Sequence, residues 1–153
     1  VLAHPGNIPD MHFMLQKEMA ARLSAQPGSK AWGRLSVMTQ ITVDAEYLFD
    51  VPPQSFDPPP KVDSSIIRLT PIAHDALPVP RKSLDKVLRL AFAARRKRMS
   101  NALKTLQLDW SGLAVDPGKR ADDVTIDEFL AIAEQSQAMQ RATQTKGEPG
   151  VAY

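Results

Sequence analysis

The segment Phe56-Asp57-Pro58-Pro59-Pro60-Lys61-Val62-Asp63-Ser64 separates two stretches with strand-like sequences. Its three consecutive prolines lack backbone N–H donors and hold φ at about −65°. This predicts a stiff, extended connection rather than a helix or a central strand. Such a connection fixes the direction of the Phe56 ring. Two interpretations follow from this: a rigid aromatic platform beside a ligand, or a phenylalanine that fills the core.

The sequence on both sides of this segment predicts an α/β region. Residues 11–15 form a short apolar run typical of a buried strand, and the alternation over 41–51 and the β-branched run over 62–69 predict two more strands. Residues 18–23 and 33–40 predict two helices. Three strands and so few helices cannot cover both faces of a sheet, so we expect neighbouring strands upstream.

After residue 74 the pattern becomes helical. A face of leucines and other apolar side chains begins near Ser83 and is interrupted by Arg95-Arg96-Lys97-Arg98, a full helical turn of charge, which predicts two helices or one bent helix. Thr125 and Glu128 have capping-box spacing, which predicts a last helix to about Met139. We therefore expect an α/β portion over 1–73, a helical domain over 74–142 and a disordered tail over 143–153.

Composition excludes several chemistries. The chain has no cysteine, which excludes disulfides, thiolate zinc sites and cysteine nucleophiles and fits a reducing cytoplasm. Its three histidines are scattered without metal-ligand spacing, and no apolar run approaches the roughly 20 residues of a membrane span. The chain opens at a valine inside what looks like structured protein, so we expect it to be a piece of something longer.

The net charge of +2 hides a strong asymmetry. The stretch from Arg81 to Lys104 holds nine Lys or Arg and one acid, Asp85, and so carries +8, whereas the remaining residues carry −6. Segregation on this scale predicts a surface that faces a polyanion.

Three motifs in order resemble one family. They are Asp10-Met11-His12-Phe13-Met14-Leu15-Gln16-Lys17-Glu18, Gly33-Arg34-Leu35-Ser36-Val37 and the segment from Phe56 to Ser64. Together they resemble the second half of the S-adenosylmethionine-dependent rRNA adenine N6-dimethyltransferases, most closely the bacterial enzymes that modify small-subunit rRNA. The helical part resembles their C-terminal domain, and the resemblance covers roughly residues 8 to 140.

The resemblance implies a Rossmann-like methyltransferase sheet followed by a small all-α domain, and dimethylation of two adjacent adenosines during ribosome biogenesis. It also implies S-adenosylmethionine as cofactor, small-subunit rRNA or the pre-ribosomal small subunit as partner, and no metal or membrane. The family's glycine-rich loop, its ribose-binding acid and its Asn-Leu-Pro-Tyr motif are absent from this sequence. We therefore expect the cofactor pocket to lie upstream and the chain alone to be inactive.

Site residues follow from the resemblance and the charge. The resemblance assigns stacking of the flipped target adenine to Phe56, in agreement with an aromatic ring on a stiff segment. Lys61 is either a phosphate contact or a solvated charge, and Arg34 either contacts RNA or pairs with an acid. The expected RNA-backbone contacts are Arg81, Lys82, Lys86, Arg89, Arg95, Arg96, Lys97, Arg98 and Lys104.

Other functions remain open at this point. The erythromycin-resistance methylases, which act on large-subunit rRNA, share the Phe-x-Pro-x-Pro-Lys-Val pattern. A module that binds RNA or the ribosome without chemistry could have the same fold. A DNA-binding helical protein would need a recognition helix that starts with base-reading side chains, and the basic segment offers no clear one.

Overall fold

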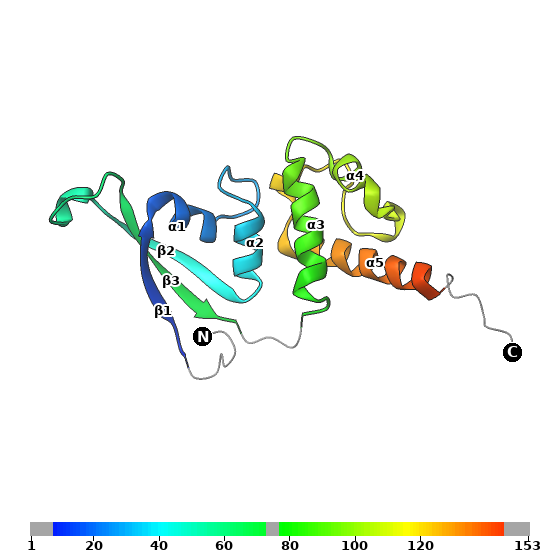
Figure 1. Cartoon of the computed structure of the whole chain (residues 1–153), viewed down its shortest axis with the longest axis horizontal. Helices are drawn as coiled ribbons and strands as arrows, with labels where there is room; N and C mark the ends of the chain where they lie inside the picture. The colour runs from blue at the N-terminus through cyan, green and yellow to red at the C-terminus, as the bar shows by residue number, and fades with distance from the viewer. Residues whose placement is uncertain (1–7, 73–76, 146–153) are drawn as a thin grey trace, which may run out of the picture. The chain divides into compact units, whose positions relative to one another are not determined.

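The computed structural model describes residues 8–72 and 77–145, and the chain divides into two compact units at residues 75 and 76 (Figure 1). The expected junction near residue 74 and the tail from residue 146 lie outside the described residues. Each unit is described by itself.

The first unit is a small antiparallel sheet with two helices (Figure 1). The strand order is β1-β3-β2, with β3 antiparallel to both neighbours. The prediction of an α/β portion is confirmed, with the strands and helices in the expected order. The elements are β1 (Met11–Gln16), α1 (Lys17–Leu23), α2 (Arg34–Gln40), β2 (Val43–Val51) and β3 (Ser64–Pro71).

One face of this sheet carries the core of the first unit. Ile67 and Ser65 of β3 are fully buried; α1 contacts α2 and the strands β2 and β3, and α2 contacts β2. Trp32, in the turn before α2, is also fully buried. Ser36 stabilises the entry to α2, because its hydroxyl donates to the Arg22 carbonyl at 2.6 Å and accepts from the Gly33 N–H at 3.1 Å.

The prediction that residues 11–15 form a buried strand is wrong in its burial. Phe13 is 44% exposed and Met14 is 52% exposed, although both lie in β1. Within the described residues β1 is an edge strand, bonded to β3 alone, and the helices leave one face of the sheet open. The apolar run predicted the strand correctly but not what lies against it.

A β-bulge interrupts the alternation expected over residues 41–51. Tyr47 pairs with Ile67, but Phe49 pairs with Ile66, so Leu48 is the extra residue. Because Ile66 and Ile67 point to opposite faces, Phe49 lies on the face opposite Tyr47 and is 58% exposed. The shift also returns Asp50, opposite Ser65, to the face of Tyr47.

The connection from β2 to β3 begins with a 3₁₀ turn, Pro53–Ser55. Beyond it the backbone has neither helix nor strand, as the three prolines predict, but it bends at residues 56–58 and 61–62. The Asp57–Pro58 peptide bond is cis. The connection is therefore a bent loop rather than the straight extended rod that the sequence indicated.

The second unit is all-helical (Figure 1). Its long helices, α3 (Arg81–Ala93) and α5 (Ile126–Thr145), pack against each other, and Phe92 and Phe129 meet with ring centroids 5.7 Å apart. The expected apolar face is confirmed at Leu84 and Leu88, which are fully buried. In the chain, α3 is followed by α4 (Met99–Ala102) and by the 3₁₀ turns Lys104–Leu106, Trp110–Gly112 and Ala121–Asp123, and α5 comes last.

The last helix begins with the expected capping box. The Thr125 N–H donates to Glu128 Oε2 at 2.9 Å, and the Glu128 N–H donates to Thr125 Oγ1 at 3.3 Å. The helix continues to Thr145, beyond the predicted end at Met139, so residues 143–145 are helical rather than disordered. The polar composition predicted disorder there, but Gln140, Arg141, Ala142 and Gln144 are good helix formers, and adding residues to an existing helix costs little.

Candidate nucleic-acid interface

Phe56 lies in the loop between β2 and β3, directly after the 3₁₀ turn. Its backbone is extended, and its N–H donates to the Pro53 carbonyl at 3.2 Å. The residue is half-buried and is not part of the buried core. A partly exposed ring on a loop with little backbone freedom fits a platform for a ligand better than a core plug.

Both ends of this loop are attached to the sheet. It leaves β2 after Val51 and enters β3 at Ser64, and these two residues face each other in the ladder. The Lys17 N–H, at the end of β1, donates to the Asp63 carbonyl at 3.0 Å. The loop that carries Phe56 therefore starts and ends at one edge of the sheet, where β1 and β2 also end.

A polar cluster fixes the same edge. Asp50 accepts hydrogen bonds from the Lys17 ammonium at 2.8 Å, from Ser65 Oγ at 2.8 Å and from the Tyr47 hydroxyl. Tyr47 and Ser65 also lie 2.6 Å apart, oxygen to oxygen. The bulge makes the cluster possible, because residues three apart in a regular strand point to opposite faces.

These hydrogen bonds stabilise the ionised carboxylate. The bond from Lys17 first, then those from Tyr47 and Ser65, lower the pKa of Asp50 to about 2, and the same pair raises the pKa of Lys17. The cluster thus joins the ends of β1 and β2 to the start of β3 next to the Phe56 loop.

The sign of the Asp50 shift gives a prediction. Its pKa is lower in the folded protein than its usual 3.8, so its contribution to stability is complete above that value and disappears as the pH falls through about 2. We expect Asp50→Asn to destabilise the chain near neutral pH, by an amount that shrinks between about pH 4 and pH 2. Urea unfolding across this range measures the difference. Asp44→Asn, on an exposed residue of the same strand, is the matched control, and a difference for Asp50→Asn that does not change with pH would contradict the assignment.

Lys61 lies in the same loop and is exposed. It is available to a phosphate, although exposure alone equally fits a solvated charge. Arg34 begins α2 and is also exposed.

The four consecutive basic residues do not form a helical turn, which corrects the sequence-based expectation. Helix α3 ends at Ala93, and Arg95, Arg96, Lys97 and Arg98 lie in the connection to α4. Of the two predicted arrangements, two helices or one bent helix, the structure has two helices, α3 and α4, with the basic residues between them. Four adjacent cations repel one another along a helix, and extended backbone at Arg98 redirects the chain into α4.

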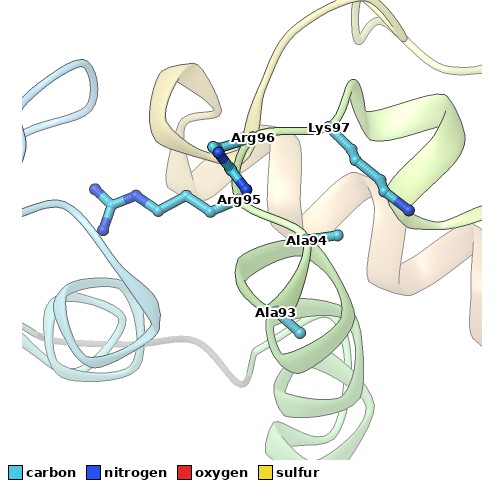
Figure 2. A pocket seen from close by; sticks show the side chains of 5 residues that line it. All are labelled: Ala93, Ala94, Arg95, Arg96 and Lys97. Atoms are coloured by element: carbon cyan, nitrogen blue, oxygen red, sulfur yellow. The ribbon is translucent and has the colours of Figure 1, made fainter.

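This connection, which we call the basic loop (residues 95–98), borders a hollow of about 510 Å³ lined by residues 93–97. The side chains of Arg95 and Lys97 point in opposite directions (Figure 2). Arg96, Lys97 and Arg98 are exposed. The loop therefore presents cations in several directions, as a surface that follows a bent phosphate backbone requires.

Two members of the basic loop have partners within the second unit. The Arg95 Nε lies 2.5 Å from Asp122 Oδ1, an ion pair without the alignment of a good hydrogen bond, so Arg95 has a structural role. Arg98 forms an isolated antiparallel bridge with Arg120, which places a further exposed arginine beside the loop. The sequence did not indicate Arg120 as a site residue, because it is 22 positions away from Arg98 and next to acids.

The other predicted contacts are distributed over the second unit. Lys82 and Lys86 line a separate hollow of about 250 Å³, and Lys104 is exposed in a 3₁₀ turn. Arg81 is exposed at the start of α3. Arg89 is paired with Asp85, Nε to Oδ2, at 2.9 Å, and this pair is a surface ion pair of small energetic value.

The described residues do not fit a methyl-donor pocket. Strand β1 passes directly into α1 at Lys17 without a glycine, whereas a nucleotide-type cofactor needs a glycine-rich turn there for close backbone approach. Across residues 8–72 and 77–145 the glycines are scattered, at positions 28, 33, 112 and 118. The same part of the chain has no group of three metal-ligating side chains and no helix that is long and apolar enough to cross a bilayer.

Comparison with known proteins places this geometry in context. The family model described as ribosomal RNA adenine dimethylase matches residues 2–138. A Pseudomonas putida protein named ribosomal RNA small subunit methyltransferase A is 45% identical over 148 residues, which are 93% of this chain and 54% of that protein. A Legionella pneumophila protein of the same name is 48% identical over 133 residues, 82% of this chain and 50% of its own length. The chain thus spans about half the length of the curated relatives it matches.

Solved structures show the same fold. A dimethyladenosine transferase from Plasmodium falciparum superposes with a TM-score of 0.69 at 22% identity, over 86% of this chain and 59% of that one. The 23S rRNA methyltransferase ErmE superposes with a TM-score of 0.54 at 25% identity, over 89% of this chain and 57% of that one. The predicted methyltransferase-type sheet followed by a helical part is therefore confirmed as the fold class.

Proposed function

Because the chain belongs to the ribosomal RNA adenine dimethylase family, we propose that it forms the RNA-binding and adenine-presenting part of an S-adenosylmethionine-dependent rRNA adenine N6-dimethyltransferase. The proposed substrate is a pair of adjacent adenosines near the 3′ end of small-subunit rRNA, modified in the cytoplasm during ribosome biogenesis. The match of the family model to residues 2–138, together with relatives named for the small subunit, is the observation that carries this proposal.

In this proposal the helical unit binds RNA. The stretch from Arg81 to Lys104 carries +8, and its exposed cations line two hollows of the second unit. Structured RNA is bound largely through phosphates, shape and 2′-hydroxyls, which suits lysines and arginines on an irregular surface. The basic loop is the main contact, with Arg120 beside it.

Phe56 has a different role. An exocyclic amine inside a duplex is out of reach, so the target adenine must leave its stack, at a cost of a few kcal/mol. The half-buried Phe56 ring would replace the lost stacking, and the attachments at Lys17 and Asp63 would hold its loop in place. Positioning of this kind supplies a large part of the acceleration for such a transfer.

The methyl donor does not belong to the described residues. We assign S-adenosylmethionine to the half of the relatives that this chain does not span, because the glycine-rich turn is absent here. By itself the chain is expected to bind RNA without methylating it.

Two other functions are less well supported. The 23S rRNA methyltransferase ErmE superposes on this chain with a lower TM-score than the dimethyladenosine transferase. A binding module without chemistry would have the same basic surface but would not need a half-buried aromatic ring on a fixed loop.

RNA selectivity of the chain tests the proposal. Fluorescence anisotropy would compare a hairpin from the 3′ end of small-subunit rRNA with a large-subunit rRNA hairpin of equal length and charge. We expect tighter binding to the first, because shape and loop contacts add to the electrostatic attraction common to both. Equal affinity for the two hairpins would contradict the small-subunit assignment, and failure to bind either would contradict the RNA-binding role.

A further inference from the structure

The second hollow of the helical unit is separate from the basic loop. It measures about 250 Å³ and lies between α3 and α5, which pack against each other. One wall is the start of α3 with Lys82, Ser83 and Lys86, and the other is the middle of α5 with Ser136, Gln137 and Gln140. Lys82 and Lys86 are four residues apart, so both point to one face of the helix.

The distance from the basic loop follows from helix geometry. About nine residues of α3 separate the middle of this hollow from the end of the helix at Ala93, and a rise of about 1.5 Å per residue gives roughly 14 Å to the point where the basic loop begins. Successive phosphates of one strand advance by only about 3.4 Å along a duplex axis. An RNA that touched both the hollow and the basic loop would therefore do so with phosphates several nucleotides apart or on different strands.

The charges of this hollow are available to a ligand. Neither Lys82 nor Lys86 forms an ion pair with any residue that the structure describes. Asp85 lies between them in sequence, but its carboxylate is engaged by Arg89 at 2.9 Å. The hollow lining, within the described part of the chain, contains no carboxylate and no aromatic ring.

The chemistry of the lining selects one class of ligand. Two ammonium groups suit phosphates, and two amides with two serine hydroxyls suit groups that both donate and accept, such as the ribose 2′-hydroxyl. Unpaired bases would need an aromatic platform, which this lining lacks. We propose that the α3–α5 hollow is a second RNA-binding site, which takes the ribose-phosphate backbone of a double-helical segment while the basic loop holds another part of the same RNA.

This inference rests on the proposed function and adds two assignments to it. Lys82 and Lys86 supply electrostatic attraction, whereas Gln137 and Gln140 distinguish RNA from DNA. In A-form RNA the 2′-hydroxyls line a wide, shallow minor groove that side chains can reach, and DNA lacks them.

The test measures binding of the intact chain to a small-subunit rRNA hairpin and to a DNA hairpin of the same sequence, over a range of salt concentrations. Lys82→Gln/Lys86→Gln should lower the log–log salt slope by about 2, roughly one unit per phosphate contact. Lys82→Arg/Lys86→Arg should retain the slope. Gln137→Ala/Gln140→Ala should leave the slope unchanged and reduce the preference for RNA over DNA.

Controls separate this inference from the proposed function. Arg22→Gln/Lys30→Gln removes two positive charges from the first unit and should change the slope far less. If the double lysine variant keeps the wild-type slope while basic-loop variants lose theirs, the second site is disproved and the proposed function stands. If the wild-type chain does not bind the hairpin at all, both fail.

Discussion

Replacing Phe56 by alanine should lower methyl transfer by about 5- to 150-fold while leaving RNA affinity nearly unchanged. Stacking of a base on an aromatic side chain contributes about 1–3 kcal/mol, and each 1.4 kcal/mol corresponds to about a tenfold change in rate. Most of the RNA contact area belongs to phosphates rather than to the flipped base. The loss should therefore appear in kcat rather than in the dissociation constant.

A chimaera makes this effect measurable. Residues 8–142 of this chain would be joined to the N-terminal half of the Pseudomonas putida relative, with which the chain shares 45% identity. Phe56→Trp should keep most of the activity, because it retains an aromatic face, whereas Phe56→Leu should behave like alanine. Circular dichroism checks folding. If Phe56→Ala unfolds the protein and abolishes RNA binding, the ring fills the core and the stacking role is wrong.

Removing two cations from the basic loop should weaken RNA binding and flatten its salt dependence. Arg96→Gln/Lys97→Gln is expected to reduce the log–log slope by about 2, with the affinity loss largest at low salt, where phosphate contacts dominate. Arg95 is left in place, because its ion pair with Asp122 makes it a structural residue and its loss would disturb the turn before α5. Anisotropy titrations from low to physiological salt give the slope.

The result is interpreted against Arg22→Gln/Lys30→Gln, which removes an equal charge from the first unit. A slope that falls equally in both double variants would show a general charge effect and exclude the basic loop as a contact. A slope unchanged by Arg96→Gln/Lys97→Gln would remove the loop from the interface entirely.

The sequence predicted the elements well but not their surroundings. Alternation and β-branched runs located all three strands of the first unit within about two residues, since periodicity is a local property. Burial of β1 was predicted wrongly, because whether Phe13 is covered depends on which elements pack against an edge strand. Strand periodicity contains no information on that point.

The bulge shows a second limit. A strict alternation from Val43 to Val51 placed Tyr47 and Phe49 on one face, yet an extra residue at Leu48 reverses the pattern. The hydrogen bonds that join Asp50 to Lys17, Tyr47 and Ser65 depend on this shift. Register slips of one residue are not visible in composition, so the polar cluster could not be predicted.

The charge excess of the second unit was directly visible in the sequence, whereas its role in RNA binding remains a proposal. The excess charge from Arg81 to Lys104 required no structure, because it is a property of composition. Its division into a basic loop and a separate α3–α5 hollow did require one, as did the bridge that brings Arg120 next to Arg98.

The central claim is that this chain presents adenosines of small-subunit rRNA for methylation, and the product of the unmutated chimaera tests it most directly. The chimaera would be incubated with S-adenosylmethionine and with unmethylated small or large ribosomal subunits, and the nucleosides analysed by mass spectrometry. We predict N6,N6-dimethyladenosine at two adjacent positions near the 3′ end of small-subunit rRNA, and none in large-subunit rRNA. A folded, cofactor-binding chimaera that leaves small-subunit rRNA unmodified, or that modifies only large-subunit rRNA, would contradict the claim.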